Sequence, residues 1–246
     1  GVVGINEGRD DGDGHHNEDQ DHADFAIGAA KKAAHGNLKG AALGEHLLNE
    51  FGGEWLPAKR IEDANGNTLV QHKHNTIQQL VEYNLISHQE LKNYIVFVGV
   101  ANPYSSLLTL YTKYRYRYAE WRAEGRPFLR SDSVANEIEY CSNHTINQWV
   151  FSRYWKPALK SIIGLQHYTV NEGYLKGCKE VLRKEYLQSD FELMLSKHAI
   201  AGNPTIPRIN KTEGKIQDPT LAFNWLSRWL IYITYKSDFD RFGYKR

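Results

Sequence analysis

The chain is poor in sulfur-containing residues. Among its 246 residues it has one methionine and two cysteines, Cys141 and Cys178. Two cysteines are too few for the disulfide framework of a small extracellular scaffold. The N-terminus is also acidic and lacks a hydrophobic segment of the kind found in secretory signals. Together these features predict an intracellular protein in a reducing compartment.

Long apolar runs are also missing. The most apolar windows, residues 94–101 and 229–235, fall well short of the roughly 18 residues that span a bilayer. We therefore expect no membrane among the partners.

The common nucleotide-binding and nucleophile motifs are absent too. The chain has no Gly-x-x-x-x-Gly-Lys-Ser/Thr, no Gly-x-Gly-x-x-Gly and no Gly-x-Ser-x-Gly. Their absence argues against the enzyme classes that use those motifs. Whether the protein is an enzyme of another kind stays open at this point.

Charge is distributed unevenly along the chain. The net charge is +1, but residues 1–24 hold eight acidic residues and one basic residue, which leaves +8 for residues 25–246. The first segment has little apolar content and no periodicity, so it is predicted to be an acidic, histidine-containing flexible arm. Residues 25–246 are predicted to form a single, mainly helical domain.

The fold class that the pattern favours is mainly α, an irregular multi-helix bundle. Apolar residues recur at helical spacing in most segments after residue 38. An Asn-Gly pair at 65–66, flanked by alternating sequence, predicts one small β-hairpin at about 58–73. The predicted helices cover residues 23–35, 38–51, 75–86, 88–101, 104–124, 131–143, 145–155, 171–187, 190–200 and 218–235, and another follows Pro157.

The stretch from Tyr111 to Arg122, YTKYRYRYAEWR, can be interpreted in two ways. On a strand, its tyrosines and arginines would face opposite sides. On a helix, five residues form one stripe at steps of four and three: Leu107, Tyr111, Tyr114, Tyr118 and Trp121. The helix is favoured because the stripe extends back to Leu107, and it is predicted to face the core rather than to stack on bases. The last predicted helix has a similar apolar face, formed by Leu221, Trp225, Trp229 and Tyr232.

A cationic flank remains beside the Tyr111–Arg122 stripe. Six basic residues lie close together in the sequence, opposed by Glu120 and Glu124. They could contact nucleic-acid phosphates, or form a solvated helix face, and the positive body of the chain supports the first hypothesis. The candidate nucleic-acid-binding residues are Lys113, Arg115, Arg117, Arg122, Arg126 and Arg130.

A second constellation begins at Glu45, which lies on a predicted helix; Asp63 precedes the hairpin turn, and Gln71 and Lys73 lie on the following strand. This order resembles the core of metal-dependent nucleases of the PD-(D/E)xK type. The resemblance implies that the carboxylates would hold Mg²⁺ and that the lysine would stabilise the reacting phosphate. The chain departs from the pattern because it has no Pro-Asp, and glutamine replaces the second carboxylate.

The sequence favours a non-enzymatic structural or assembly protein. Fifteen tyrosines and six tryptophans predict aromatic-rich packing and a homo-oligomer. The positive body predicts contact with a nucleic-acid backbone, as in a nucleoprotein or a coat subunit of a larger particle such as a virion, with no cofactor. The alternatives are the Mg²⁺-dependent nuclease, in which Glu45, Asp63, Gln71 and Lys73 are catalytic, and an enzyme whose dispersed site leaves no motif.

Overall fold

A computed structural model describes most of the chain as two compact units. The described residues are 24–28, 38–53, 56–64, 68–70, 75–126, 129, 131–166, 168–169, 172–207 and 218–246. Unit 1 contains those within Ala23–Val100 and Asn171–Thr212, and unit 2 contains those within Ala101–Val170 and Glu213–Arg246. The acidic arm lies outside the described residues except for Asp24. The arm and the single domain at 25–246 both stay predictions.

Unit 1 is built on a three-stranded sheet. Strand β4 (Ile95–Val100) lies between β1 (Asp24–Gly28) and β5 (Glu180–Arg183). It pairs antiparallel with β1, placing Asp24 opposite Gly99, and parallel with β5, placing Phe97 opposite Glu180. The run IVFVGV suits the central strand because β-branched and aromatic residues pack well on a pleated surface that is buried on both faces.

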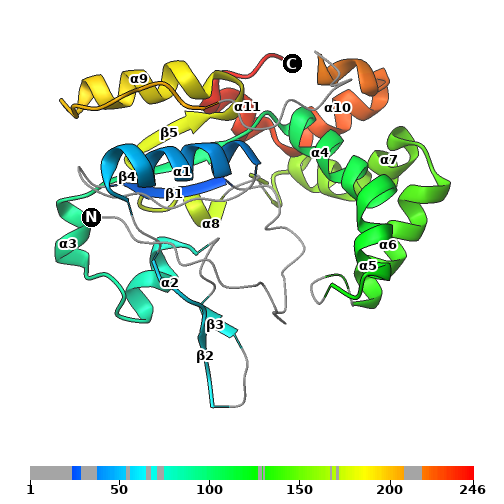
Figure 1. The fold of residues 1–246 in the computed structure, drawn as a ribbon. Helices are drawn as coiled ribbons and strands as arrows, with labels where there is room; N and C mark the ends of the chain where they lie inside the picture. The colour runs from blue at the N-terminus through cyan, green and yellow to red at the C-terminus, as the bar shows by residue number, and fades with distance from the viewer. Residues whose placement is uncertain are drawn as a thin grey trace. The chain divides into compact units, whose positions relative to one another are not determined.

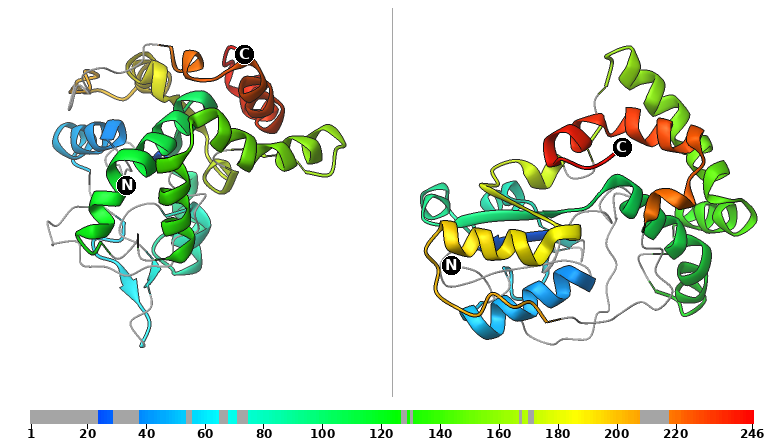
Figure 2. Two further views of the ribbon diagram at one scale, coloured as in Figure 1. Left: turned by 90° about the vertical axis from the view of Figure 1, so that its right-hand side faces the viewer. Right: turned by 90° about the horizontal axis from the view of Figure 1, so that it is seen from above.

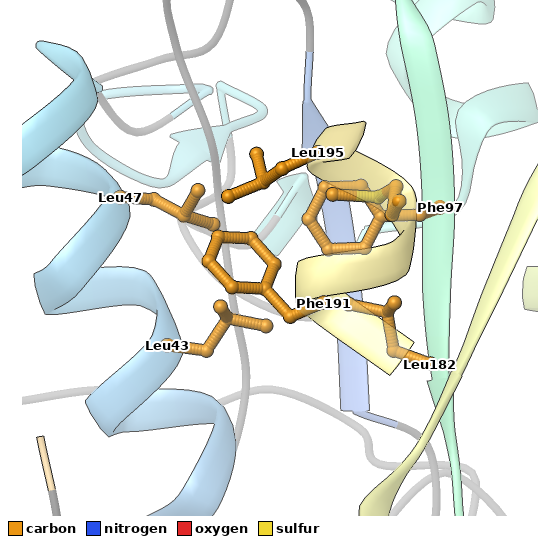
Figure 3. Close-up of a cluster of buried hydrophobic side chains, with 7 residues drawn as sticks. Leu43, Leu47, Phe97, Leu182, Phe191 and Leu195 are labelled. Atoms are coloured by element: carbon orange, nitrogen blue, oxygen red, sulfur yellow. The ribbon is translucent and has the colours of Figure 1, made fainter. Parts of the chain in front are cut away.

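Two helices cover one face of this sheet and form the core of unit 1. Helices α1 (Leu38–Phe51) and α9 (Leu187–Lys197) lie on the same side of the strands (Figure 1, Figure 2). Their leucines and Phe191 pack against side chains from β4 and β5, as Figure 3 shows. The buried cluster consists of Leu43, Leu47, Phe97, Leu182, Phe191, Met194 and Leu195.

All three of these strands correct the sequence predictions. Ser87 does begin a helix with the predicted capping box, in which Ser87 Oγ accepts from the Glu90 amide at 3.1 Å. That helix, α3 (His88–Lys92), ends after five residues, so the helix predicted at 88–101 is wrong from Ile95 onward. In the same way, residues 171–187 hold the short α8 (Glu172–Leu175) and then β5. The helix predicted at 23–35 is replaced at its start by β1.

The predicted hairpin is confirmed. Strand β2 (Ile61–Glu62) pairs antiparallel with β3 (Thr68–Val70), and Ile61 lies opposite Val70. Helix α2 (Ile77–Glu82) follows, begun by a capping box at Thr76.

Unit 2 is helical. In chain order it contains α4 (Pro103–Thr112), a π-helical turn (Lys113–Arg117), α5 (Tyr118–Ala123), α6 (Asp132–Asn143) and α7 (Ile146–Ile162). A 3₁₀ turn (Pro219–Ala222), α10 (Trp225–Thr234) and α11 (Lys236–Phe242) complete it. Helix α7 runs through Pro157, so the helix predicted to end at 155 and the one predicted from Pro157 are a single helix.

The last predicted helix is also corrected in its extent and in the face that it buries. Asp218 caps only the 3₁₀ turn, and α10 begins with Asn224 as its N-cap. The residues that α10 buries are Ser227, Leu230, Ile231 and Thr234. The predicted apolar face is not buried, since Trp225 is 73% exposed and Leu221 and Trp229 are also exposed.

The mainly α class with one small hairpin is confirmed for the described residues. None of the described helices is long and apolar enough to cross a bilayer.

Candidate nucleic-acid interface

Four of the six candidate cations, Lys113, Arg115, Arg117 and Arg122, lie on one continuous helical rod in unit 2. Asn102 begins α4, its side chain accepting from the Tyr104 amide at 2.9 Å, and Pro103 occupies the first helical position. The rod continues through the π-helical turn into α5. The predicted stripe is confirmed as core, because Leu107, Tyr111, Tyr114 and Tyr118 are buried and Trp121 is half-buried. The aromatic rings therefore support packing rather than base stacking.

Arg115 binds the C-terminal end of α6. Its guanidinium donates to the carbonyl oxygens of Cys141 at 2.9 Å and His144 at 2.8 Å. It also donates to the Tyr111 hydroxyl at 2.7 Å, which in turn donates to the His144 carbonyl. The last carbonyls of a helix have no partner within it, and a cation there also meets the negative end of the helix dipole.

Arg122 makes equivalent hydrogen bonds at the N-terminal end of α6. Its Nη1 donates to the carbonyl oxygens of Leu129 and of Ser131, the N-cap residue of α6, the latter at 3.1 Å. Arg115 and Arg122 are seven residues apart and share one face of the rod, so together they hold both ends of α6. The sequence predicts phosphate contacts for these two arginines, and in the structure the Nη1 group of each donates to backbone carbonyl oxygens.

Arg117 and Arg126 gather on the half-buried indole ring of Trp121. The guanidinium carbons lie 5.1 Å (Arg117) and 4.1 Å (Arg126) from the ring centroid, within the range of cation–π attraction. Arg126 also pairs with Glu124 at 2.8 Å, whereas Arg117 is exposed. We call Arg117, Trp121 and Arg126 the indole platform.

The remaining two candidate cations give less support to the phosphate-binding hypothesis. The Lys113 ammonium lies 5.7 Å from the centroid of the Tyr118 ring. Arg130 lies outside the described residues. The phosphate-binding hypothesis therefore rests chiefly on Arg117 and Arg126, with Lys113 beside them.

The nuclease constellation is only partly described. Glu45 is exposed on α1, and Asp63 is half-buried directly after β2. Gln71 and Lys73 lie outside the described residues, so their convergence with Glu45 and Asp63 stays a prediction. Within the described ranges, no three His, Cys, Asp or Glu side chains are grouped to hold a metal ion.

Two features of unit 2 were missed by sequence reasoning. The π-helical turn lies within the cationic segment, where such turns often mark functional sites. It has no sequence signature that distinguishes it from α-helix. The second feature is a set of exposed apolar residues on α7, which the sequence does signal through their spacing of three and four residues.

The environment of Cys141 leads to a testable expectation. Burial, reinforced by the nearby Glu137 carboxylate, raises the pKa of the Cys141 thiol to about 12. At about pH 8, close to the ordinary pKa of a thiol, Cys141 stays protonated, and a thiol reacts through its thiolate.

We expect maleimide labelling of the folded protein to modify the half-buried Cys178 much faster than the buried Cys141. Peptide mass spectrometry at timed intervals measures both rates, and the urea-unfolded chain, in which the two rates become similar, is the control. Equal rates in the folded protein would contradict the buried position of Cys141.

Comparison with known proteins gives no relative. No family model matches the chain, and the searches of curated proteins and of solved structures give no significant match.

Proposed function

We propose that the protein is a non-enzymatic assembly protein that binds a nucleic-acid backbone through unit 2 and associates with further copies of itself. The observation that carries the nucleic-acid part is the distribution of charge among the stretches of the chain that follow residue 22. The unit 2 stretches 101–170 and 213–246 contain 15 basic and nine acidic residues. The unit 1 stretches 23–100 and 171–212 contain 14 basic and 13 acidic residues.

The indole platform gives this charge a local site. Stacking on Trp121 restricts two long side chains that would otherwise lose more entropy on binding a phosphate. A guanidinium that stacks on an aromatic face still has hydrogen-bond donors at its edge, and these suit phosphate oxygens. Backbone contact of this kind does not discriminate between sequences.

The test is the salt dependence of binding. We expect the affinity for a DNA or RNA oligonucleotide to fall linearly on a log–log plot against salt, with a slope of about 0.9 per neutralised phosphate on duplex DNA. Arg117→Gln with Arg126→Gln should weaken binding for all sequences alike and reduce the slope by about two. Fluorescence anisotropy over a range of salt concentrations measures both quantities.

The matched control moves the same charge change to unit 1. Lys92 and Lys176 are exposed there, and Lys92→Gln with Lys176→Gln should leave affinity and slope close to wild type. The chain lacking residues 1–23 is assayed in parallel, because the acidic arm could compete for the basic surface and β1 begins only at Asp24. Absence of binding at low salt in both chains would overturn the nucleic-acid part of the proposal.

A further inference from the structure

Helix α7 exposes a continuous stripe of large apolar side chains. Phe151, Trp155, Leu159 and Ile162 follow one another at steps of four, four and three, which places them on one face. Each is between 42% and 53% exposed, and Ile163 and Leu165 extend the exposed set past the end of the helix. We call these six residues the α7 stripe.

The stripe is separate from the face that α7 already uses within unit 2. The buried residues of the helix are Trp149, Val150 and Ala158. The Tyr154 ring packs against Tyr235, just beyond α10, at a centroid distance of 5.8 Å. The α7 stripe is therefore a second apolar face on a helix whose first face is satisfied.

The size of the stripe matches an interface between proteins. With about 200 Å² for a large apolar residue, the six side chains expose on the order of 600 Å². That is at the upper end of the largest apolar patch on a typical monomer, about 300–600 Å². It is also most of the roughly 800 Å² that each partner buries in a standard interface.

The charges on α7 and α6 indicate what kind of partner covers the α7 stripe. Helix α7 holds three basic residues and no acidic one, whereas the preceding α6 holds three acidic residues and no basic one. Arg153, Lys156 and Lys160 recur at steps of three and four on one side of α7. Arg153 pairs with Glu137 of α6 at 2.5 Å, so this is the side on which α6 lies.

Exposed charges of opposite sign therefore lie on neighbouring helices. Lys156 and Lys160 are exposed on α7, and Asp132 and Glu139 are exposed on α6. A two-fold axis that sets two α7 helices antiparallel brings the α6 side of one copy to the α6 side of the other. The basic α7 of each copy then meets the side occupied by the acidic α6 of its partner, which is the self-complementarity that an isologous dimer needs. An anionic membrane surface would attract α7 but repel the carboxylates of α6.

We infer that the α7 stripe is a two-fold interface between copies of this chain. The inference rests on the self-association in the proposed function and assigns that association to one surface. Its aromatic and aliphatic centre with charged flanks has the composition of a protein–protein interface.

The test measures the dimer dissociation constant of the full chain by sedimentation equilibrium. Leu159→Gln with Ile162→Gln removes apolar contact in both copies at once, and we expect it to weaken dimerisation by about 100-fold or more. Leu193→Gln is the matched control, since Leu193 is an exposed leucine on α9 of unit 1, and it should leave the constant unchanged. Circular dichroism checks that each variant folds. If the variant with Leu159→Gln and Ile162→Gln does not fold, Phe151→Ser with Trp155→Ser is used for the same measurement.

The outcomes separate two failures. A wild-type chain that stays monomeric at all concentrations overturns the proposed self-association. A wild-type dimer that the stripe variants leave intact overturns the assignment of the interface, while the self-association stands. A third outcome is a monomeric wild type that co-sediments with phosphatidylserine vesicles. If Leu159→Gln with Ile162→Gln abolishes this vesicle binding, the stripe binds a membrane surface and the inference is overturned.

Discussion

Phe191→Ala should lower the free energy of unfolding by about 3–5 kcal/mol, the usual cost of truncating a buried phenylalanine. Phe191 is completely buried in the cluster between α1, α9 and the sheet (Figure 3). Its ring makes edge contacts with Phe51 and with His46, at centroid distances of 6.1 and 6.0 Å. The substitution would leave a cavity that helices on one side and strands on the other cannot collapse to fill. Urea denaturation followed by far-UV circular dichroism measures the change.

The control for this prediction lies on the same helix. Leu193 is 68% exposed on α9, so Leu193→Ala should change the free energy of unfolding by no more than about 0.5 kcal/mol. Equal losses for the two variants would show that α9 does not bury the face containing Phe191. A small loss for Phe191→Ala would show that the cluster tolerates a cavity.

Local signals in the sequence correctly predicted the starts of α3 and α4. The capping box at Ser87 and the Asn102-Pro103 start are interactions within four residues, so their chemistry is visible in a short window. The hairpin is similar, because its two strands are separated only by the turn that signals it. The core stripe around Tyr111 was predictable because its spacing matches the helical repeat over several turns.

The three-stranded sheet was not predictable in this way. An apolar run as short as residues 95–100 is compatible with either a buried strand or a helix. What decides between a strand and a helix is the pairing of β4 with β1 and β5, whose partner residues lie 67 to 83 positions away in the sequence. The residues of α3 predict a helix correctly, and the prediction failed only because the next segment has distant partners.

The sequence predicted which cations belong to the candidate site, but not which groups each cation contacts. The sequence shows that Arg115 and Arg122 share a face. It does not show that α6 lies against that face with carbonyl oxygens at both ends. The exposed residues of α10 and α7 illustrate the converse limit, because apolar periodicity identifies a face without identifying what covers it. Trp225 and Leu159 are both exposed, and no described residue of unit 2 covers their exposed parts.

Trp149→Ala should destabilise unit 2 by about 3–5 kcal/mol. Trp149 is 2% exposed on α7 and packs near Tyr111, at a centroid distance of 5.8 Å. Its indole N–H donates to the Glu137 carboxylate, the same group that binds Arg153. Truncation removes a large buried surface and one hydrogen bond to a carboxylate of α6. Trp225→Ala is the control, because Trp225 is mostly exposed, and it should have little effect on stability when measured at low protein concentration.

Measured together, Trp149→Ala and Phe191→Ala also test the organisation of the chain. The two residues belong to different compact units. If residues 25–246 fold as a single domain, each variant shifts one common transition, and circular dichroism and tryptophan fluorescence report the same midpoint. Two transitions, one moved by Trp149→Ala and the other by Phe191→Ala, would contradict the single-domain prediction. In that case unit 2, which carries both the indole platform and the α7 stripe, would be the part of the chain whose stability limits the proposed function.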